Sequence, residues 1–419
     1  MGHSRTLGGA TRSVPLAKIA TRRGRGRATP PSLVCTPPWC SPCPSCLVIA
    51  SLLQSLRALR VPVGRSTTVV GLDLGTATIK LVVAQHQQRT VRITKMVAFP
   101  TPAGTVSSHG ITDAGRLAAT LREAWATHEL PAHTVLVACL GGRDVVLERI
   151  LVENGPTAEI DAQVQARAVN DVPFDPDDTL YSYMPLRTPA AEAQVPVLLV
   201  GVHNAQAQAM KSMLGKLAPL TTLKRLDVQV AALYNAFTRT MPGVRGPALF
   251  AHLGDQSTTA LLLDEDGRLL SARDLPRGFR GLRDALVQQG AARDVADTAL
   301  RTVGGMDSHP DVLQAWVHDL ASDVQLLWRA AGLSGLQRPL FLTGGGSLSP
   351  DVVSALTEAL HSSGTECVDP VSALQIPFAA IDASLSRASA GPLCMVALGL
   401  ALRDDALLTP ARRAAKKGR

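Results

Sequence analysis

The chain has 419 residues, of which 46% are hydrophobic and 3% aromatic, with 42 lysines and arginines against 34 acidic residues. This composition excludes collagen, a coiled coil and a wholly disordered chain, and it predicts a globular protein with tails. The positive charge lies at the two ends, because residues 1–65 hold ten basic and no acidic side chains and residues 411–419 hold five basic ones. Residues 66–410 carry 27 basic and 34 acidic side chains, a net charge of −7, so the charge gives no support to specific nucleic-acid binding.

Residues 1–65 predict a basic tail that contains prolines and cysteines and is disordered. Four of its cysteines have a spacing that a zinc or iron–sulfur site could use: Cys35, Cys40, Cys43 and Cys46. Prolines interrupt this run and no histidine accompanies it, which favours an unstructured tail, or an upstream stretch that is not translated, with Val61 or Val63 as the start. The alternative is a basic segment that touches anionic lipid or nucleic acid. Its apolar part is too short to span a membrane.

The apolar pattern predicts regular structure from Thr67 onwards. A strand, a tight turn and two further strands are expected at Thr67–Leu72, Asp73–Thr76, Ile79–Ala84 and Val91–Ala98. A helix with one apolar face follows at Leu117–Trp125. The next block predicts a small inserted subdomain of two strands, a helix and a strand: Val135–Cys139, Val145–Leu151, Ala158–Val169 and Leu180–Leu186. A strand and two helices then return the chain to the main body: Val195–Val202, Ala205–Leu217 and Val228–Phe237.

The second half of the chain begins as the first does. Three strands and two helical stretches are expected at Ala248–Leu253, Thr258–Leu263, Arg268–Asp274, Leu282–Val303 and Val312–Leu333. They are followed by a strand, a glycine-rich turn and two helices at Pro339–Thr343, Gly344–Ser347, Pro350–Leu360 and Leu393–Leu402. An offset of 179 residues places Asp73–Thr78 over His252–Ser257. We interpret this similarity as a duplicated half-domain.

Three turns in this pattern suit phosphate and nucleoside binding. A hairpin turn that carries Gly75 can bring backbone N–H groups against a phosphate, because glycine has no Cβ. The duplicated turn at residues 254–257 would approach from the other side, so that two hairpins clamp one nucleotide. The turn Gly344–Ser347 joins a strand to a helix and offers a surface where the backbone can approach a base or a ribose. In this order, the three turns predict a two-lobed nucleotide-binding protein.

Six segments also carry a family resemblance. They are residues 70–82, Gly110–Asp113, Val169–Tyr183, Leu226–Ala232, Leu342–Gly346 and Ala397–Ala401. These segments resemble motifs of the actin/Hsp70/hexokinase superfamily and, within it, of the PilM family of type IV pilus assembly proteins, which is related to FtsA. The resemblance covers nearly all of residues 67–402. It implies an α/β, two-lobed actin/Hsp70-like fold, built of duplicated mixed-sheet ribonuclease-H-like domains with a small inserted αβ subdomain.

The resemblance further implies ATP and Mg²⁺ as ligands. Asp73 would hold Mg²⁺ through water. The first phosphate turn would be formed by Gly75, Thr76 and Ala77, with Lys80 before the second strand. The second phosphate turn would be formed by Gly254, Asp255, Gln256, Ser257 and Thr258. Adenosine and ribose would be faced by Gly344, Gly345, Gly346 and Ser347.

One position departs from the family pattern. The second phosphate hairpin of the family begins with Asp, and here it begins with His252. A neutral imidazole cannot replace the charge of a carboxylate that orients water or a metal shell, although Asp255 could compensate in part if it points inward. The alternative is that His252 is a satisfied residue at the edge of the cleft. In both cases we expect ATP hydrolysis to be slow or absent and assign no catalytic residue.

The resemblance implies a division into lobes. The first lobe would comprise residues 66–102, 193–227 and 375–404. The partner-binding insertion would comprise residues 103–192. The second lobe would comprise residues 228–275 and 339–374, with a helical subdomain at 276–338. A basic tail would follow at 405–419.

The implied function is a cytoplasmic, ATP-binding scaffold, peripheral at the inner membrane, in the type IV pilus assembly platform. It would dock the N-terminal peptide of a PilN-like inner-membrane protein, with other platform proteins and self-association as further expected contacts, and its basic tails could touch the membrane. Two alternatives stay open: an actin-fold ATPase or phosphotransferase, and an FtsA-like division protein. The second predicts an amphipathic C-terminal helix, and residues 412–419 lack the apolar face that such a helix needs.

Overall fold

The structure is a computed structural model in which all described residues belong to one compact unit. It describes residues 67–87, 90–142, 145–171, 175–186, 193–333, 337–403 and 412–413. Our expectations for residues 1–65, for the motif at 172–174 and for most of residues 405–419 lie outside these ranges. Within them, no helix combines the length and the apolar character that crossing a membrane requires.

The first lobe is built on a five-stranded mixed sheet. Its strands are β1 (Thr67–Leu74), β2 (Thr78–Gln87), β3 (Thr90–Pro100), β6 (Thr134–Leu140) and β10 (Thr221–Val228), in the order β10-β6-β1-β2-β3. β2 runs antiparallel to β1 and β3, whereas β6 runs parallel to β1 and β10. The register places Asp73 opposite Lys80 at the end of the β1–β2 hairpin. The tight turn predicted at residues 73–76 is therefore formed.

The second lobe repeats this topology. Its strands are β11 (Ala248–Leu253), β12 (Thr258–Leu263), β13 (Leu269–Leu275), β14 (Pro339–Thr343) and β15 (Gly364–Cys367), in the order β13-β12-β11-β14-β15. The first three strands are antiparallel neighbours, and β14 and β15 continue the sheet in parallel. Both lobes thus have a hairpin, a third antiparallel strand and two parallel strands. The predicted duplication and the two-lobed α/β fold are confirmed.

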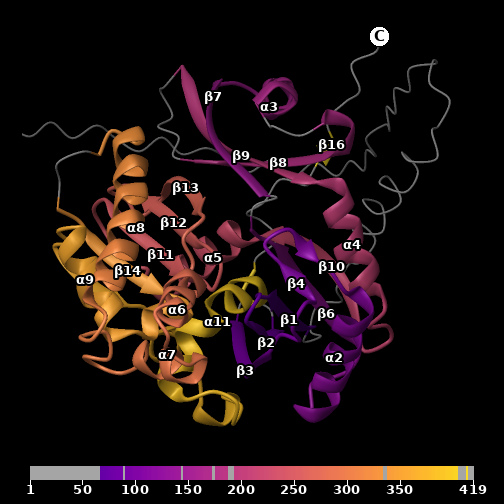
Figure 1. The fold of residues 1–419 in the computed structure, drawn as a ribbon. Coiled ribbons are helices and arrows are strands. Elements are labelled where there is room, and N and C mark those ends of the chain that lie inside the picture. The colour runs from indigo at the N-terminus through magenta and orange to yellow at the C-terminus, as the bar shows by residue number, and fades with distance from the viewer. Residues whose placement is uncertain are drawn as a thin grey trace, which may run out of the picture. The chain divides into compact units, whose positions relative to one another are not determined.

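A third sheet forms the small inserted subdomain, above the lobes in Figure 1. It contains β7 (Val145–Glu153), β8 (Thr179–Pro185) and β9 (Gln194–His203), with the two-residue strand β16 (Arg412–Arg413) at the edge of β8. Helix α3 (Thr157–Asp171) covers one face, where Ile150 and Val152 pack with Val164 and Ala168.

Two strands were assigned to the wrong sheet in the sequence analysis. β6, expected in the insertion, is the neighbour of β1 in the first lobe, and β9, expected in the first lobe, pairs with β7 and β8. Both strands are almost entirely buried. A buried apolar strand shows no alternation, so its sequence does not reveal which sheet it joins.

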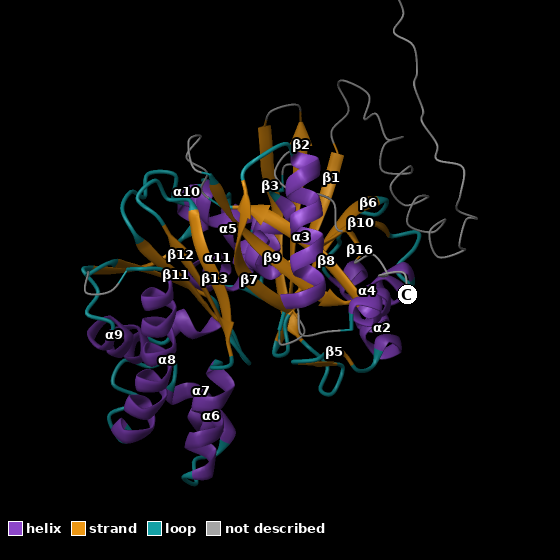
Figure 2. Ribbon diagram, turned by 90° about the horizontal axis from the view of Figure 1, so that it is seen from above, coloured by secondary structure: helices purple, strands orange, loops and turns teal. Residues whose placement is uncertain are grey.

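Helices and short elements complete the fold. In the first half these are β4 (Val106–Ser107), β5 (Gly110–Ile111), α2 (Ala114–Thr127), η1 (Pro176–Asp178), α4 (Asn204–Gly215) and α5 (Gln229–Thr240). In the second half they are α6 (Phe279–Gln288), α7 (Arg293–Ala299), α8 (Pro310–Ala330), η2 (Gly345–Leu348), α9 (Pro350–Ala359), α10 (Pro370–Ala373), η3 (Phe378–Ala380) and α11 (Arg387–Ala401). Figure 2 shows α6, α7 and α8 grouped beside the second sheet.

Two helix predictions differ from the structure in their bounds. The single helical stretch expected at Leu282–Val303 is divided into α6 and α7, because Gly290 has φ 97° and ends the first of them. The last helix begins at Arg387 and not at Leu393, since Ser386 and Ser389 form a capping box there.

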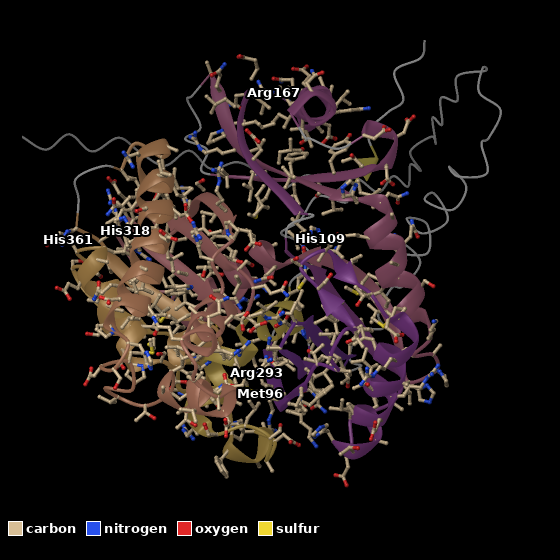
Figure 3. The ribbon with its side chains drawn as sticks, in the orientation of Figure 1. Met96, His109, Arg167, Arg293, His318 and His361 are labelled. Atoms are coloured by element: carbon tan, nitrogen blue, oxygen red, sulfur yellow. The ribbon has the colours of Figure 1, made fainter. Side chains whose placement is uncertain are left out.

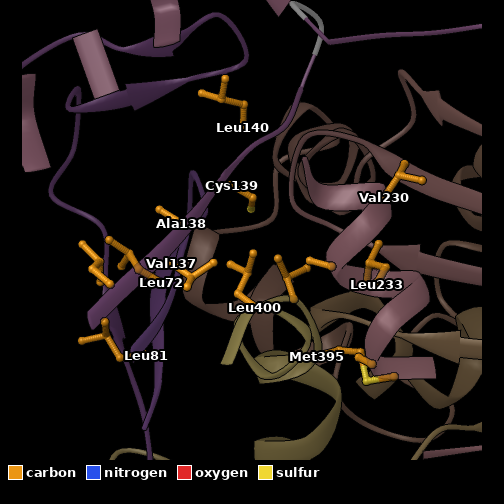
Figure 4. Close-up of a cluster of buried hydrophobic side chains, with 14 of the residues drawn as sticks. Leu72, Leu81, Val137, Ala138, Cys139, Leu140, Val230, Leu233, Met395 and Leu400 are labelled. Atoms are coloured by element: carbon orange, nitrogen blue, oxygen red, sulfur yellow. The ribbon is translucent and has the colours of Figure 1, made fainter. Parts of the chain in front are cut away.

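Helix α11 lies against the first sheet and α5 with almost no space between the backbones. A Cβ placed on Gly399 would lie 1.8 Å from the carbonyl oxygen of Ala232, and one on Gly71 would lie 2.0 Å from that of Ala397. Apolar side chains fill the surrounding space, among them Leu72, Val137 and Leu400 (Figure 4). Glycine is therefore required at both contacts.

We expect the substitution Gly399→Ala to lower the free energy of unfolding by about 1–3 kcal/mol or more. The added methyl group would overlap the backbone of α5, which can move away only if the whole helix shifts. Gly281→Ala is the matched control, since Gly281 lies in α6 and a methyl group there would meet no atom within 4 Å. The control should be neutral or stabilising by about 0.5–1 kcal/mol. Urea unfolding of the two variants measures the difference, and equal stabilities would contradict the close packing of α11.

Candidate functional site

A cavity of about 410 Å³ lies between the hairpin turns of the two lobes. Eleven of the fourteen predicted site residues line it: Asp73, Gly75, Thr76, Ala77, Lys80, Gly254, Asp255, Gln256, Ser257, Gly345 and Gly346. The other three, Thr258, Gly344 and Ser347, are not among the lining residues. The tertiary structure thus brings together turns that are far apart in the sequence.

The first hairpin presents a charged pair at the floor of the cavity. Lys80 Nζ lies 3.1 Å from Asp73 Oδ2, and both side chains are only 11% exposed. Their pairing follows from the β1–β2 register, which sets the two residues opposite each other. A Cβ on Gly75 would lie 2.7 Å from Lys80 Nζ, so a side chain at this position would collide with the ammonium group. The ammonium group is therefore held at the cavity by a carboxylate.

The tips of the two hairpins meet at Asp255. Its Oδ2 accepts hydrogen bonds from Thr76 Oγ1 at 2.9 Å and from Arg280 Nε at 2.9 Å, and its Oδ1 accepts one from Arg283 at 3.1 Å. Thr76 and Asp255 are counterparts under the offset of 179 residues, so the bond joins equivalent points of the duplicated turns. Both carboxylate oxygens have partners, so Asp255 does not supply the free carboxylate that we considered as compensation for His252.

His252 occupies the position in the second lobe that Asp73 has in the first. Its side chain is buried, and Nδ1 has no hydrogen-bond partner. Burial disfavours the imidazolium and lowers the pKa of His252 to about 4; the charge of Asp73 opposes this shift, and that of Lys80 adds to it. The imidazole is therefore neutral at pH 7. The second lobe therefore has an uncharged ring at the position where the first lobe has Asp73.

The glycine-rich turn after β14 divides into structural and lining positions. Gly344 has φ 88°, and a Cβ there would lie 2.5 Å from the carbonyl oxygen of Leu253. Its carbonyl oxygen accepts a hydrogen bond from the buried hydroxyl of Ser347. Gly345 and Gly346 follow in η2 and line the cavity. Gly344 and Ser347 therefore shape the turn, and its next two glycines form the surface.

Thr258 also supports the site from within the fold. Its side chain is fully buried and donates a hydrogen bond of 2.6 Å to the carbonyl oxygen of Arg277. Because this side chain is buried and Thr258 does not line the cavity, it points into the lobe. The sequence pattern predicted the turn but did not show which of its side chains face the cavity and which face the interior of the lobe.

Several lining residues were not found in the sequence. They include Gly141, Gly142, Gln229, Arg283 and Arg301, together with the turn around His109 between β4 and β5 (Figure 3). Gly141 and Gly142 follow β6, outside the three turns that the sequence predicts to bind a nucleotide. Arg283 lies in the middle of α6, where no local motif marks it. The helix is held against the second hairpin by backbone hydrogen bonds from Phe279 N to Gly254 O and from Arg280 N to Asp255 O.

The donor set at the cavity is poorly suited to holding a divalent cation. The two lining carboxylates, Asp73 and Asp255, each pair with basic side chains. In the part of the chain that the structure describes, no group of three His, Cys, Asp or Glu side chains is placed to bind a metal ion. Mg²⁺ in nucleotide sites is held through one or two carboxylates, waters and phosphates, and here both lining carboxylates already pair with basic side chains. The site instead offers lysine, arginine and glycine backbone to an anion.

The duplicated sheets, with a cavity between equivalent hairpin turns, define an actin-like two-lobed protein. Residues 71–405 match the model of the family described as "Type IV pilus assembly protein PilM". The chain therefore belongs to the PilM family of type IV pilus assembly proteins. The family that the sequence motifs resembled is confirmed.

The chain is similar to several solved structures. The chain resembles a protein in a "PilM-PilN type IV pilus biogenesis complex", with 24% identity, a TM-score of 0.67 and coverage of 80% of this chain and 97% of that one. Ethanolamine utilization protein EutJ from Carboxydothermus hydrogenoformans has 15% identity, a TM-score of 0.46 and coverage of 85% and 98%. MreB 5 of Spiroplasma citri, bound to AMPPNP, has 12% identity, a TM-score of 0.42 and coverage of 80% and 95%. A comparison with curated protein sequences finds no significant match.

The buried His252 predicts a pH dependence of stability. Its pKa of about 4 in the folded state lies below the ordinary value of 6.5, so between these pH values the unfolded chain binds a proton that the folded one does not. Stability therefore falls as the pH decreases from about 6.5 to 4, by up to about 3 kcal/mol from this residue.

Urea unfolding of wild type and His252→Gln at pH 7.5 and pH 5 tests this expectation. Glutamine does not titrate in this range, so the variant should lose less stability than the wild type on acidification. The same loss in both proteins would show that other groups cause the acid sensitivity.

Proposed function

We propose that this protein binds ATP in the cavity between its lobes and acts as a scaffold in the type IV pilus assembly platform. The observation that carries the proposal is the meeting of the two duplicated hairpins, with Thr76 bonded to Asp255, around a cavity lined by glycine turns and Lys80. Turns of this kind present backbone N–H groups to phosphates, and a lysine adds a positive charge. The cavity also has the size expected for a small-molecule ligand.

The cleft is better suited to holding a nucleotide than to hydrolysing it. His252 is neutral and buried, and both oxygens of Asp255 accept hydrogen bonds from Thr76 and arginines. The low pKa of His252 makes its imidazole a weak base, and both oxygens of Asp255 already accept hydrogen bonds, so neither group is well suited to take a proton from attacking water. We therefore propose that ATP stabilises the arrangement of the lobes and that phosphate release is slow or absent.

The partner that we propose is the N-terminal cytoplasmic peptide of a PilN-like membrane protein. The similar solved structure is of a complex between a PilM and a PilN protein, and its PilM chain is matched over nearly its whole length. In this chain the third sheet with α3 is a compact subdomain that contacts β13 of the second lobe through β7 and α4 of the first lobe through β9. Leu151 on β7 is 47% exposed and faces away from Ile150 and Val152, which pack under α3. An exposed leucine of this kind can serve as an apolar anchor for a peptide.

Lys80→Gln should weaken ATP binding by at least about tenfold, because a charged donor to phosphate is lost. Lys216→Gln is the matched control, since Lys216 is exposed at the end of α4 and does not line the cavity. Calorimetric titration with ATP, run alongside a phosphate-release assay, measures both properties. Absence of binding by the wild type would refute the proposed nucleotide site, and rapid release would favour an ATPase.

Leu151→Asp should weaken binding of the PilN-like N-terminal peptide by about tenfold, because a charge replaces an apolar contact. Val303→Asp provides the control, since Val303 is 79% exposed on the second lobe. Fluorescence anisotropy with a labelled synthetic peptide gives the affinities. Equal affinities for wild type and Leu151→Asp would move the docking surface away from this face of β7.

A further inference from the structure

More cationic than anionic side chains line the cavity. Three cations line it, Lys80, Arg283 and Arg301, against the two carboxylates Asp73 and Asp255. Lys80 is paired with Asp73, and Arg283 is paired with Asp255 and, at 3.3 Å, with Asp297. The lining therefore carries more positive than negative charge before any ligand enters. Such a cavity attracts an anion and not a free cation.

Arg283 is fixed in position by the fold. Gly278 lets the start of α6 approach the second hairpin, since a Cβ at this glycine would lie 2.2 Å from the carbonyl carbon of Gln256. The helix then places the Arg283 side chain at the cavity, only 11% exposed. Its terminal nitrogens contact Asp255 and Asp297, whereas Nε is buried without a hydrogen-bond partner. An unsatisfied buried donor at a cavity wall is costly unless a ligand accepts from it.

Two further buried polar atoms around the same cavity lack partners. They are Oε1 of Gln256 and Nδ1 of His252. With Arg283 Nε, they give three unsatisfied polar atoms on the second-lobe wall, which is the wall without the carboxylate of the family pattern. Ordered water or a polar ligand would satisfy these atoms.

We propose that Arg283, together with Lys80, neutralises the phosphates of the bound nucleotide in place of a protein-held divalent cation, so that the cavity takes ATP without Mg²⁺. The inference rests on the proposed function, because it concerns the same cavity. A guanidinium offers several donors in a planar arrangement that matches phosphate oxygens, and it cannot be deprotonated. Asp255 and Asp297 hold the guanidinium at the cavity wall. His252 then belongs to a metal-independent site, since no second carboxylate is needed to orient a hydrated cation.

Calorimetric titration of the full chain with ATP, in excess EDTA and in Mg²⁺, tests this inference. The wild-type affinity in EDTA should stay within about threefold of that in Mg²⁺. Arg283→Gln should weaken binding by at least about tenfold in EDTA, and Arg283→Lys should recover part of the loss because it restores the charge. Arg293→Gln is the matched control, because Arg293 is an exposed arginine at the start of α7 that does not line the cavity (Figure 3). Thermal unfolding of each variant confirms that it is folded.

A second variant tests whether adding a carboxylate to the second-lobe wall makes ATP binding depend on Mg²⁺. His252→Asp supplies a carboxylate at the counterpart of Asp73, so Mg²⁺ should then strengthen ATP binding by about tenfold over EDTA. Wild-type binding in Mg²⁺ but not in EDTA would overturn the inference and leave the proposed nucleotide site intact. Wild-type affinity of Arg283→Gln in EDTA would overturn the assignment of Arg283. Absence of binding in both buffers would refute the proposed function itself.

Discussion

The contact of helix α11 with both lobes is the constraint on which the site depends. Its Gly399 lies against the backbone of α5 at Ala232, and β1 approaches it through Gly71. At its other side, the carbonyl oxygen of Pro392 accepts hydrogen bonds from Gly344 N and Thr343 Oγ1, at the turn that borders the cavity. One helix thus connects the first sheet to the glycine-rich turn of the second. The spacing of the cavity walls is set by backbone contacts, which tolerate far less adjustment than contacts between flexible side chains.

Charge organises the opposite side of the cavity. Asp255 gathers Thr76 from one lobe and two arginines from α6 of the other around a single, largely buried carboxylate. Removing one partner from such a group leaves an uncompensated charge away from water, which makes the arrangement sensitive to small changes. These contacts also affect which ligand the cavity can bind. The Asp255 carboxylate is occupied by its partners, so cationic side chains and backbone N–H groups remain to face a ligand. Stability and ligand preference therefore arise from one set of contacts.

His252 gives the second-lobe wall of the cleft a different character from the first-lobe wall, which carries Asp73. A buried neutral imidazole avoids placing a second negative charge close to Asp73, and its pKa of about 4 makes it only a weak base. The scaffold that we propose does not require turnover, and slow hydrolysis would keep a bound nucleotide in place. Ligands bound in this way stabilise the native state by mass action. A cleft that holds its ligand without turnover therefore suits the role in assembly that we propose.

The amino-acid sequence by itself determined the features that depend on local pattern. The β1–β2 and β11–β12 hairpins, their relation by an offset of 179 residues and most helices follow from alternation, helical periodicity and glycine turns. The family and eleven lining residues were likewise recognisable, because short motifs carry the turns. Three of the predicted turn positions do not line the cavity: Thr258, Gly344 and Ser347. The sequence of a turn does not show which of its residues face the cavity.

Only the tertiary structure decided the features that depend on contacts between distant segments. It placed β6 beside β1 and β9 in the third sheet, since a fully buried strand has no polar face that would mark its neighbours. It also brought Arg283 to the cavity through the docking of α6 on the second hairpin, for which the middle of a helix carries no local signal. The burial that makes His252 neutral has the same origin. Proximity and desolvation are properties of the packed chain, and they control the charge of the site.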